Sequence, residues 1–165
     1  MKHLRLYLIL ALVPIGACQQ EAPQAKERAS SVLPGDTVEQ GGLAAAYGRL
    51  VLPAVKGNPG AAYFRIFNGT EKPVSIVGVS IRGAGMAHMH RTQRDSMNAL
   101  DEVIIKPTWT QRFIPGGRHV MAMDLDPKLK AGGKTEMILT FADGQTITVP
   151  LRIETVGTAV VEPEP

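Results

Sequence analysis

The sequence predicts an all-β protein, an antiparallel Greek-key β-sandwich or barrel. Between residues 43 and 156 the chain is divided into short runs rich in β-branched and aromatic residues, separated by Gly, Pro, Asn and Asp. No segment sustains the 3.6-residue apolar period of an amphipathic helix. Roughly seven to nine strands at regular spacing in about 115 residues are typical of a β-sandwich.

The runs in the first half of this region alternate between apolar and polar positions. Residues 61–70, AAYFRIFNGT, end at Asn68-Gly69, a dipeptide that signals a hairpin. Strict alternation in residues 72–83, KPVSIVGVSIRG, predicts that Ile76 and Ile81 lie on opposite faces. Two strands and a turn are therefore expected here.

The second half contains shorter runs and then the clearest hairpin. Residues 100–107 and 110–117 are interrupted by Pro107 and Pro115. The run RHVMAMDL follows and stops at an Asp-Pro pair. Two β-rich runs then flank Asp143-Gly144, which predicts a hairpin.

The N-terminal residues have the layout of a lipoprotein signal peptide. Residues 1–17 carry Lys2 and Arg5 near their start, and the apolar run from Leu6 to Ile15 is too short to span a bilayer. Small residues precede Cys18, the chain's one cysteine, as in a bacterial lipobox. We therefore expect residues 1–17 to be removed and Cys18 to be lipidated. The alternative is an ordinary cleavage site that precedes a cysteine.

The residues at the two ends of the sequence predict the location of the protein and its domain organisation. We expect the protein on the periplasmic side of a bacterial cell envelope, attached to the membrane by its N-terminal lipid only, and Gln19 favours the outer membrane of a Gram-negative cell. Residues 18–42 are polar, with Pro, Gly and Ser, and predict a flexible tether. Residues 157–165 predict a loose C-terminal tail, so that residues 43–156 form one domain.

Charge and cysteine content exclude several classes of function. Two of the 18 Lys and Arg residues lie in the signal peptide, so the net charge falls from +3 to +1 in the mature chain. There is no basic block and no aromatic–basic interleaving, and we expect no nucleic-acid binding. With one cysteine there is no intramolecular disulfide, so the core alone must hold the domain together.

Histidine and methionine are concentrated in one part of the mature chain. Five of its six methionines and all three of its histidines fall within residues 86–123. Methionine used as a scattered gap-filler of the core would not cluster in this way. The candidate ligands are His88, His90, His119, Met86, Met89, Met97, Met121 and Met123.

Strand alternation sorts these residues by face. His119, Met121 and Met123 share one face of RHVMAM, and the apolar residues between them suit the core face. If MAHMH is also extended, Met86, His88 and His90 share a face, while Met89 points the other way and is expected to be buried. Gly116-Gly117 predict a turn just before His119, near a strand start.

The ligand types indicate the metal. Thioether sulfur is soft and imidazole is borderline, which favours Cu(I) over Zn²⁺ or Mg²⁺. A blue-copper electron-transfer site would need a cysteine ligand, and Cys18 is assigned to the lipid anchor. This argues for a protein that carries copper.

The residues resemble the periplasmic copper chaperone A family, whose pattern is His-(Met)-x10-Met-x21-His-x-Met. Met97-x21-His119-x-Met121 matches the second half of that pattern without a gap. PGGRHVMAMDL and AAYFRIFNGT also resemble the family, over about residues 48–153. The resemblance implies a cupredoxin-like fold and a copper chaperone rather than an enzyme.

The first half of the pattern departs from the family. Met86 stands eleven residues before Met97 where a histidine is expected, while His88 and His90 lie closer. The HRTQRD that begins at His90 resembles the family's residues after its histidine, which implies a connecting hairpin shortened by four. A change of two or four preserves strand parity, so either histidine could face the site. We prefer His90 as the first ligand, with His88 next and Met86, Met89 and Met123 as additional candidates.

The resemblance also implies what the copper is for. The acceptor would be the copper machinery of cytochrome c oxidase assembly, either the CuA subunit or an assembly factor. The cargo expected from the ligand types is Cu(I), and whether the spare histidine holds a second copper as Cu(II) is left open by the sequence. Two alternatives are a lipoprotein that sequesters copper for tolerance and a β-sandwich adhesion or binding lipoprotein without metal.

Other residues have simpler interpretations. Met137 is expected in the core, and Trp109 is expected to be a partly buried residue of the sandwich rather than a shield for the metal. The arginines that flank the ligands, Arg91, Arg94 and Arg118, are either solvated or able to dock an acidic partner. The carboxylates Asp95, Asp101 and Glu102 have no accompanying nucleophile and base, so no catalytic site is predicted.

Overall fold

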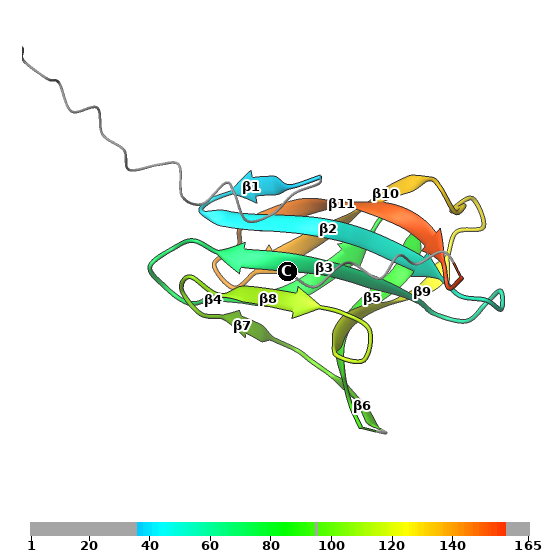
Figure 1. Ribbon diagram of the computed structural model, residues 1–165, viewed down its shortest axis with the longest axis horizontal. Helices are drawn as coiled ribbons and strands as arrows, with labels where there is room; N and C mark the ends of the chain where they lie inside the picture. The colour runs from blue at the N-terminus through cyan, green and yellow to red at the C-terminus, as the bar shows by residue number, and fades with distance from the viewer. Residues whose placement is uncertain (1–35, 95, 158–165) are drawn as a thin grey trace, which may run out of the picture.

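The computed structural model describes residues 36–94 and 96–157. In this part every regular element is a strand, and eleven strands form one nearly closed, barrel-like sheet (Figure 1). The strands are β1 (Val38–Gln40), β2 (Leu43–Leu52), β3 (Gly60–Asn68), β4 (Val74–Ile81), β5 (Ala84–Gln93), β6 (Ser96–Ala99), β7 (Val103–Ile105), β8 (Thr110–Phe113), β9 (Arg118–Leu125), β10 (Lys134–Phe141) and β11 (Thr146–Thr155). The predicted all-β class is confirmed. None of the described residues forms a helix long and apolar enough to cross a membrane.

The order of strands in the sheet is not the order in the chain. Along the main path it is β6-β5-β9-β3-β2-β11-β10-β4-β7, while β1 pairs with β2 and β8 pairs with β3. Strand β11 lies parallel to β2, and the other pairs are antiparallel. This mixture of hairpins and crossovers brings β5 and β9 side by side, although β6, β7 and β8 lie between them in the chain.

Strand β1 extends the domain into the stretch that composition assigned to the tether. Gly41 and Gly42 both have positive φ angles, of 60° and 80°, which glycine adopts without steric cost. They turn the chain so that Val38 lies opposite Ala45 on β2. Such short strands also explain why the domain has more strands than the seven to nine expected.

The hairpin expected at Asn68-Gly69 is wrong, because β3 does not pair with β4. Neither residue has the positive φ that a tight hairpin turn needs. Asn68 is instead fully buried, and its Nδ2 donates to the carbonyl oxygens of Lys72 at 2.8 Å and Ile105 at 3.0 Å. Its Oδ1 accepts from the backbone and the hydroxyl of Thr70. Asn68 thus fastens a crossover between two parts of the sheet.

The faces expected for β4 are also wrong at one end. Ile76 and Ile81 are both buried, although strict alternation separates them. The pairing with β10 shifts register between Thr140 and Phe141, so that Gly78 lies opposite Thr140 and Ile76 opposite Phe141. The extra residue of a bulge reverses the alternation, which returns Ile76 to the core.

The hairpin around Asp143-Gly144 is confirmed. Strands β10 and β11 pair in continuous register, and the Gly144 amide donates to the Phe141 carbonyl at 2.9 Å. Gly144 has a φ of 84°, and the Asp143 carboxylate accepts from the Gln145 amide at 3.0 Å. Both residue types are therefore used as the turn signal predicts.

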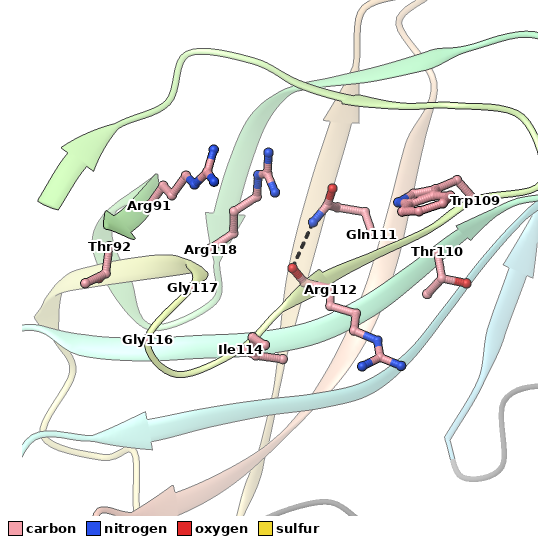
Figure 2. Close-up of a pocket in the computed structure, with 10 residues that line it drawn as sticks. All are labelled: Arg91, Thr92, Trp109, Thr110, Gln111, Arg112, Ile114, Gly116, Gly117 and Arg118. Carbon is pink, nitrogen blue, oxygen red and sulfur yellow. Dashed lines mark hydrogen bonds between the residues drawn. The ribbon is translucent and has the colours of Figure 1, made fainter. Parts of the chain in front are cut away.

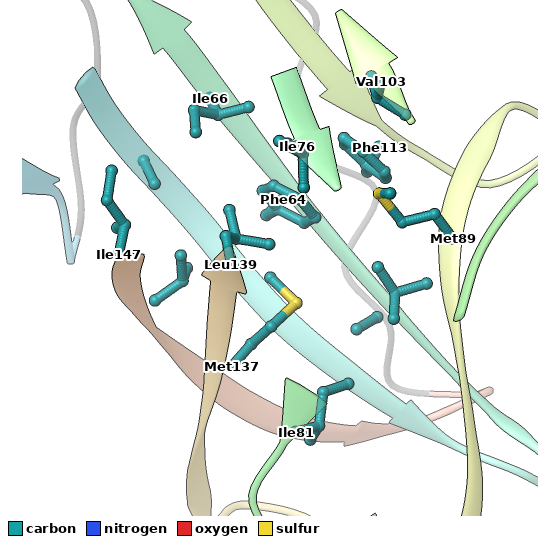
Figure 3. Close-up of a cluster of buried hydrophobic side chains, with 14 of the residues drawn as sticks. Phe64, Ile66, Ile76, Ile81, Met89, Val103, Phe113, Met137, Leu139 and Ile147 are labelled. Atoms are coloured by element: carbon teal, nitrogen blue, oxygen red, sulfur yellow. The ribbon is translucent and has the colours of Figure 1, made fainter. Parts of the chain in front are cut away.

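The barrel encloses one apolar core to which most strands contribute (Figure 3). Phe64 and Phe113 stack with ring centroids 4.2 Å apart at its centre. Met137 is fully buried, as predicted. Figure 3 shows Met89 pointing from β5 toward Phe113, so the side of β5 that carries Met89 is the core side.

Met86 and Met89 provide a matched pair on one strand, because they are 51% and 3% exposed. We expect Met89→Ala to lower the free energy of unfolding by about 2–4 kcal/mol, since it opens a cavity in the core. Met86→Ala should change it by less than about 0.5 kcal/mol. Urea denaturation of the copper-free protein measures both. Equal losses would contradict the assigned faces of β5.

Candidate metal site

The candidate ligands of β5 and β9 form a ladder on the outer face of the barrel. In antiparallel pairs, residues directly opposite each other share a face, and successive rungs on one face are about 7 Å apart along the strands. The predicted face sharing is confirmed by the register. The three rungs are His90–His119, His88–Met121 and Met86–Met123.

Strand β6 brings the fourth part of the motif to the same face. Met97 lies opposite Thr92 on β5, two residues from His90 and on the same side of the strand. Figure 1 shows the β5–β6 hairpin projecting beyond the body of the barrel, and Met97 is 51% exposed. Met97 can therefore reach the His90–His119 rung from outside, on a long unbranched side chain.

An interruption in the sheet positions His119. Strands β8 and β9 run in the same direction along β3, with Phe113 opposite Phe64 and Val120 opposite Ala62. Between them residues 114–117 leave the edge of β3 as a loop, closed by a hydrogen bond of 2.7 Å from the Ile114 amide to the Arg118 carbonyl. The Pro-Gly-Gly sequence permits this turn, and His119 is the second residue after the chain re-enters the sheet, as predicted.

The Gly117 carbonyl orients the His119 ring. His119 Nδ1 lies 3.2 Å from this oxygen, and because a carbonyl only accepts, Nδ1 carries the proton. The lone pair is then on Nε2, which is the arrangement found where an imidazole binds a metal. The same carbonyl accepts from the Thr92 amide at 3.0 Å, so it also ties the loop to β5. His119 is only 7% exposed, and is less open than sequence alternation alone suggests.

His90 packs against His119, and one of its ring nitrogens has no hydrogen-bond partner among the described residues. Its ring stacks at 5.9 Å, between centroids, on that of His119. Burial, and then the nearby His119 and His88, lower the pKa of His90. Its Nδ1 is buried and makes no hydrogen bond with the described residues. A buried polar atom without a partner is typical of a place where an ion or water binds.

Tyr63 is a neighbour of the site that sequence reasoning missed. Its ring centroid lies 6.5 Å from that of His119. The Arg49 guanidinium lies over the Tyr63 ring, 5.2 Å from the ring centroid. Burial raises the pKa of Tyr63, and Arg49 opposes this shift. Alternation with the core residues of AAYFRIF places Tyr63 on the outer face, but its nearness to His119 depends on the pairing of β3 with β9.

Two candidates lie elsewhere. Met89 is in the core on the other side of β5, as expected. Trp109 was expected to be partly buried in the sandwich, and this is wrong: it precedes β8 in a loop and is 60% exposed. Across residues 36–94 and 96–157, no group of three or more His, Cys, Asp or Glu side chains is placed to hold a metal ion.

The surface formed by His88, His90, Met97, His119 and Met121, hereafter the His/Met face, offers neutral imidazoles and thioethers. Such a donor set favours a soft, low-charge ion. His119 is shielded, and the Nδ1 atom of the partly exposed His90 is buried, while Met97 is open to solvent. The arrangement can hold such an ion at the surface of the barrel and leave one side of it accessible.

Comparisons with solved structures agree with the fold. The copper-bound PCuAC domain from PmoF2 superposes with a TM-score of 0.63 at 20% identity, covering 72% of this chain and 97% of that domain. The apo PCuAC domain from PmoF1 gives 0.63 at 23% identity, covering 72% and 98%. The Cu(I) form of DR1885 from Deinococcus radiodurans gives 0.56 at 24% identity, covering 65% and 74%. The predicted PCuAC-type, cupredoxin-like fold is confirmed.

Sequence comparison indicates the family. The chain is 29% identical over 99 residues to the putative lipoprotein Lxx21020 of Leifsonia xyli subsp. xyli, which covers 56% of this chain. The match spans 60% of the length of that relative. Residues 36–153, which include every strand of the barrel except the end of β11, match the family described as "Putative lipoprotein LpqE-like". The chain therefore belongs to the LpqE-like lipoprotein family and has the fold of a PCuAC domain.

Proposed function

We propose that this protein is a copper chaperone of the cell envelope that carries Cu(I) on the His/Met face and delivers it to a partner protein. The observation that carries the proposal is the ladder of β5 and β9, with Met97 of β6 on the same face. The fold shared with copper-bound PCuAC domains supports it. The proposed ligands are His90, Met97, His119 and Met121.

His90 is the preferred first ligand because of its position. It lies directly opposite His119 and one rung from Met97, whereas His88 is two rungs from Met97 and opposite Met121. The unpartnered Nδ1 of His90 also fits a role in binding. Met89 is left out because its side chain is in the core, and Met86 and Met123 form the rung farthest from Met97.

Transfer would proceed by exchange of ligands. Thioethers and neutral imidazoles add no charge to the complex that they form with Cu(I). Because Cu(I) accepts low coordination numbers, one ligand can leave before the next one binds. An incoming thiolate or imidazole of a partner could displace the exposed Met97 while His119 and His90 still hold the ion. We propose an acceptor in cytochrome c oxidase assembly, either the CuA subunit or an assembly factor, and a second copper as Cu(II) beside His88.

The location follows from the family and from the lipobox-like residues. We propose that Cys18 is lipidated and that the domain acts on the periplasmic side of the membrane; Cys18 lies outside the described residues. A copper-sequestering role for tolerance would use the same face without a dedicated acceptor. An adhesion or binding lipoprotein would need no copper at all.

Conservative replacement of the thioethers tests the site. Met97→Leu and Met121→Leu keep the volume of each side chain but remove the sulfur. Each should weaken Cu(I) binding at least about tenfold, since the ion loses a ligand. Competition with a chromogenic Cu(I) chelator measures this, and Asn98→Ala, an exposed change beside Met97, is the control. Wild-type affinity in both leucine variants would sink the proposal.

The two histidines of β5 can be separated by the same titration. His90→Ala should weaken Cu(I) binding more than His88→Ala, because only His90 lies on the rung shared with His119. Both changes remove a partly or fully exposed imidazole, so each serves as the control for the other. A larger loss for His88→Ala would assign the first ligand to His88 instead.

Delivery distinguishes a chaperone from a store of copper. Protein loaded with Cu(I) should lose the metal to a purified, copper-free CuA subunit domain within a single mixing experiment, after which the proteins are separated and their copper is measured. Retention of copper by this protein, with no transfer to the CuA domain or to a thiol-bearing assembly factor, would favour sequestration.

A further inference from the structure

A basic groove lies at the end of the barrel beside the His/Met face. Its volume is about 620 Å³, and residues from β5, β8, β9 and the loops around β8 line it. Figure 2 shows Arg91 and Arg118 extending side by side, with Gln111 and Trp109 across from them. Nothing in the proposed copper chemistry uses these four side chains.

Arg91 and Arg118 form a pair of like charges that has no counterion among the described residues. They lie directly opposite each other in the β5–β9 register, a position where like charges are destabilising. Neither forms an ion pair with any residue that the structure describes. Arg118 Nε is also buried with no hydrogen-bond partner in the described part of the chain.

Trp109 is exposed but held firmly. The Asn68 amide donates to the Trp109 carbonyl at 3.0 Å, and the Thr108 amide donates to the Asn68 carbonyl at 2.7 Å. Thr108 has a φ of 57°, an unfavourable conformation for a β-branched residue. Such strain is kept where the surrounding structure imposes it, and it is concentrated at functional sites. The loop therefore presents a large aromatic ring to solvent at little entropic cost.

The groove is placed next to the copper ligands by chain connectivity. Arg91 follows His90 on β5, and Arg118 precedes His119 on β9. Since neighbouring residues of a strand point to opposite sides, the arginines occupy the side of the two strands that carries Met89 and Val120, where the core ends. A molecule bound in the groove would lie at the rim of the His/Met face without covering it.

We propose that this groove docks an acidic segment of a partner protein, whose carboxylates pair with Arg91 and Arg118 while an apolar part of the segment packs on Trp109. The inference rests on the proposed function, in which a partner must approach the His/Met face. Paired guanidinium groups suit carboxylates geometrically and bind them strongly once they are desolvated.

A protein segment fits the groove better than a small inorganic anion. Arginine and tryptophan are the residue types enriched in the energetically dominant parts of protein interfaces. Gln111 is nine-tenths buried, and its Nε2 already donates to the Arg112 carbonyl at 2.9 Å, which leaves its carbonyl oxygen to accept from a backbone amide. A free anion would use the arginines but neither Trp109 nor Gln111.

The chain contains one tryptophan, so its fluorescence reports on this groove. Titration of copper-free protein with capped hexaglutamate should give a saturable change in Trp109 emission, and capped hexaglutamine should not. Arg91→Gln with Arg118→Gln should weaken hexaglutamate binding at least about tenfold. The control, Arg82→Gln with Arg152→Gln, removes two exposed positive charges elsewhere on the barrel. Its affinity for hexaglutamate should fall much less.

Three results would overturn the proposal. They are unchanged hexaglutamate affinity in the Arg91/Arg118 variant, an equal loss in the Arg82/Arg152 control, and displacement of the peptide by inorganic phosphate at an equal concentration of charge. Cu(I) affinity of the Arg91/Arg118 variant, measured separately, should stay at the wild-type value. Because the peptide titration contains no copper, its failure would leave the copper proposal standing, and the reverse is also true.

Discussion

The pairing of β5 with β9 is the constraint on which the site depends. Met89 of β5 lies opposite Val120 of β9, and both are buried. Burial of each such side chain stabilises the fold by about 1.5–3 kcal/mol. A slip of one residue would move these side chains to solvent and bring imidazoles and thioethers into the core. The core therefore sets the register, and the register sets which His and Met side chains meet on the outer face.

The loop between β8 and β9 orients the His119 ring, which strand pairing alone does not do. By leaving the edge of β3 after β8 and returning at Arg118, it directs the Gly117 carbonyl toward both the His119 ring and the Thr92 amide. One acceptor thus orients the proposed ligand His119 and fastens the strand that carries His90. In the proposed site, His119 is the shielded ligand, while Met97 on the projecting hairpin is the ligand that a partner could reach.

Sequence reasoning succeeded where a single strand determines the answer. The faces of RHVMAM and MAHMH follow from alternation, because each strand is regular throughout. It failed where the local structure depends on contacts with a second segment that is distant in sequence. Asn68-Gly69 reads as a hairpin, but the bonds of Asn68 to Lys72 and Ile105 depend on a crossover that local sequence does not encode.

The remaining errors have the same physical origin. The bulge in β4 depends on its pairing with β10, so that alternation alone put Ile76 and Ile81 on different faces. The exposure of Trp109 depends on how its loop is tied to Asn68. Tyr63 is recognised as a neighbour of His119 only once β3 and β9 are known to pair. Each of these features is a property of two segments that are distant in sequence.

The same alternation that assembles the His/Met face also separates it from the arginines. Along β5 and β9 every ligand candidate on the outer face is followed or preceded by a residue on the inner face, and at the end of the barrel that residue is Arg91 or Arg118. Docking and metal binding would therefore use opposite sides of the same two strands. A partner held by the arginines could approach the proposed copper ligands from the rim, where the open side of Met97 lies, and it would not have to displace the side chains that are proposed to hold the ion.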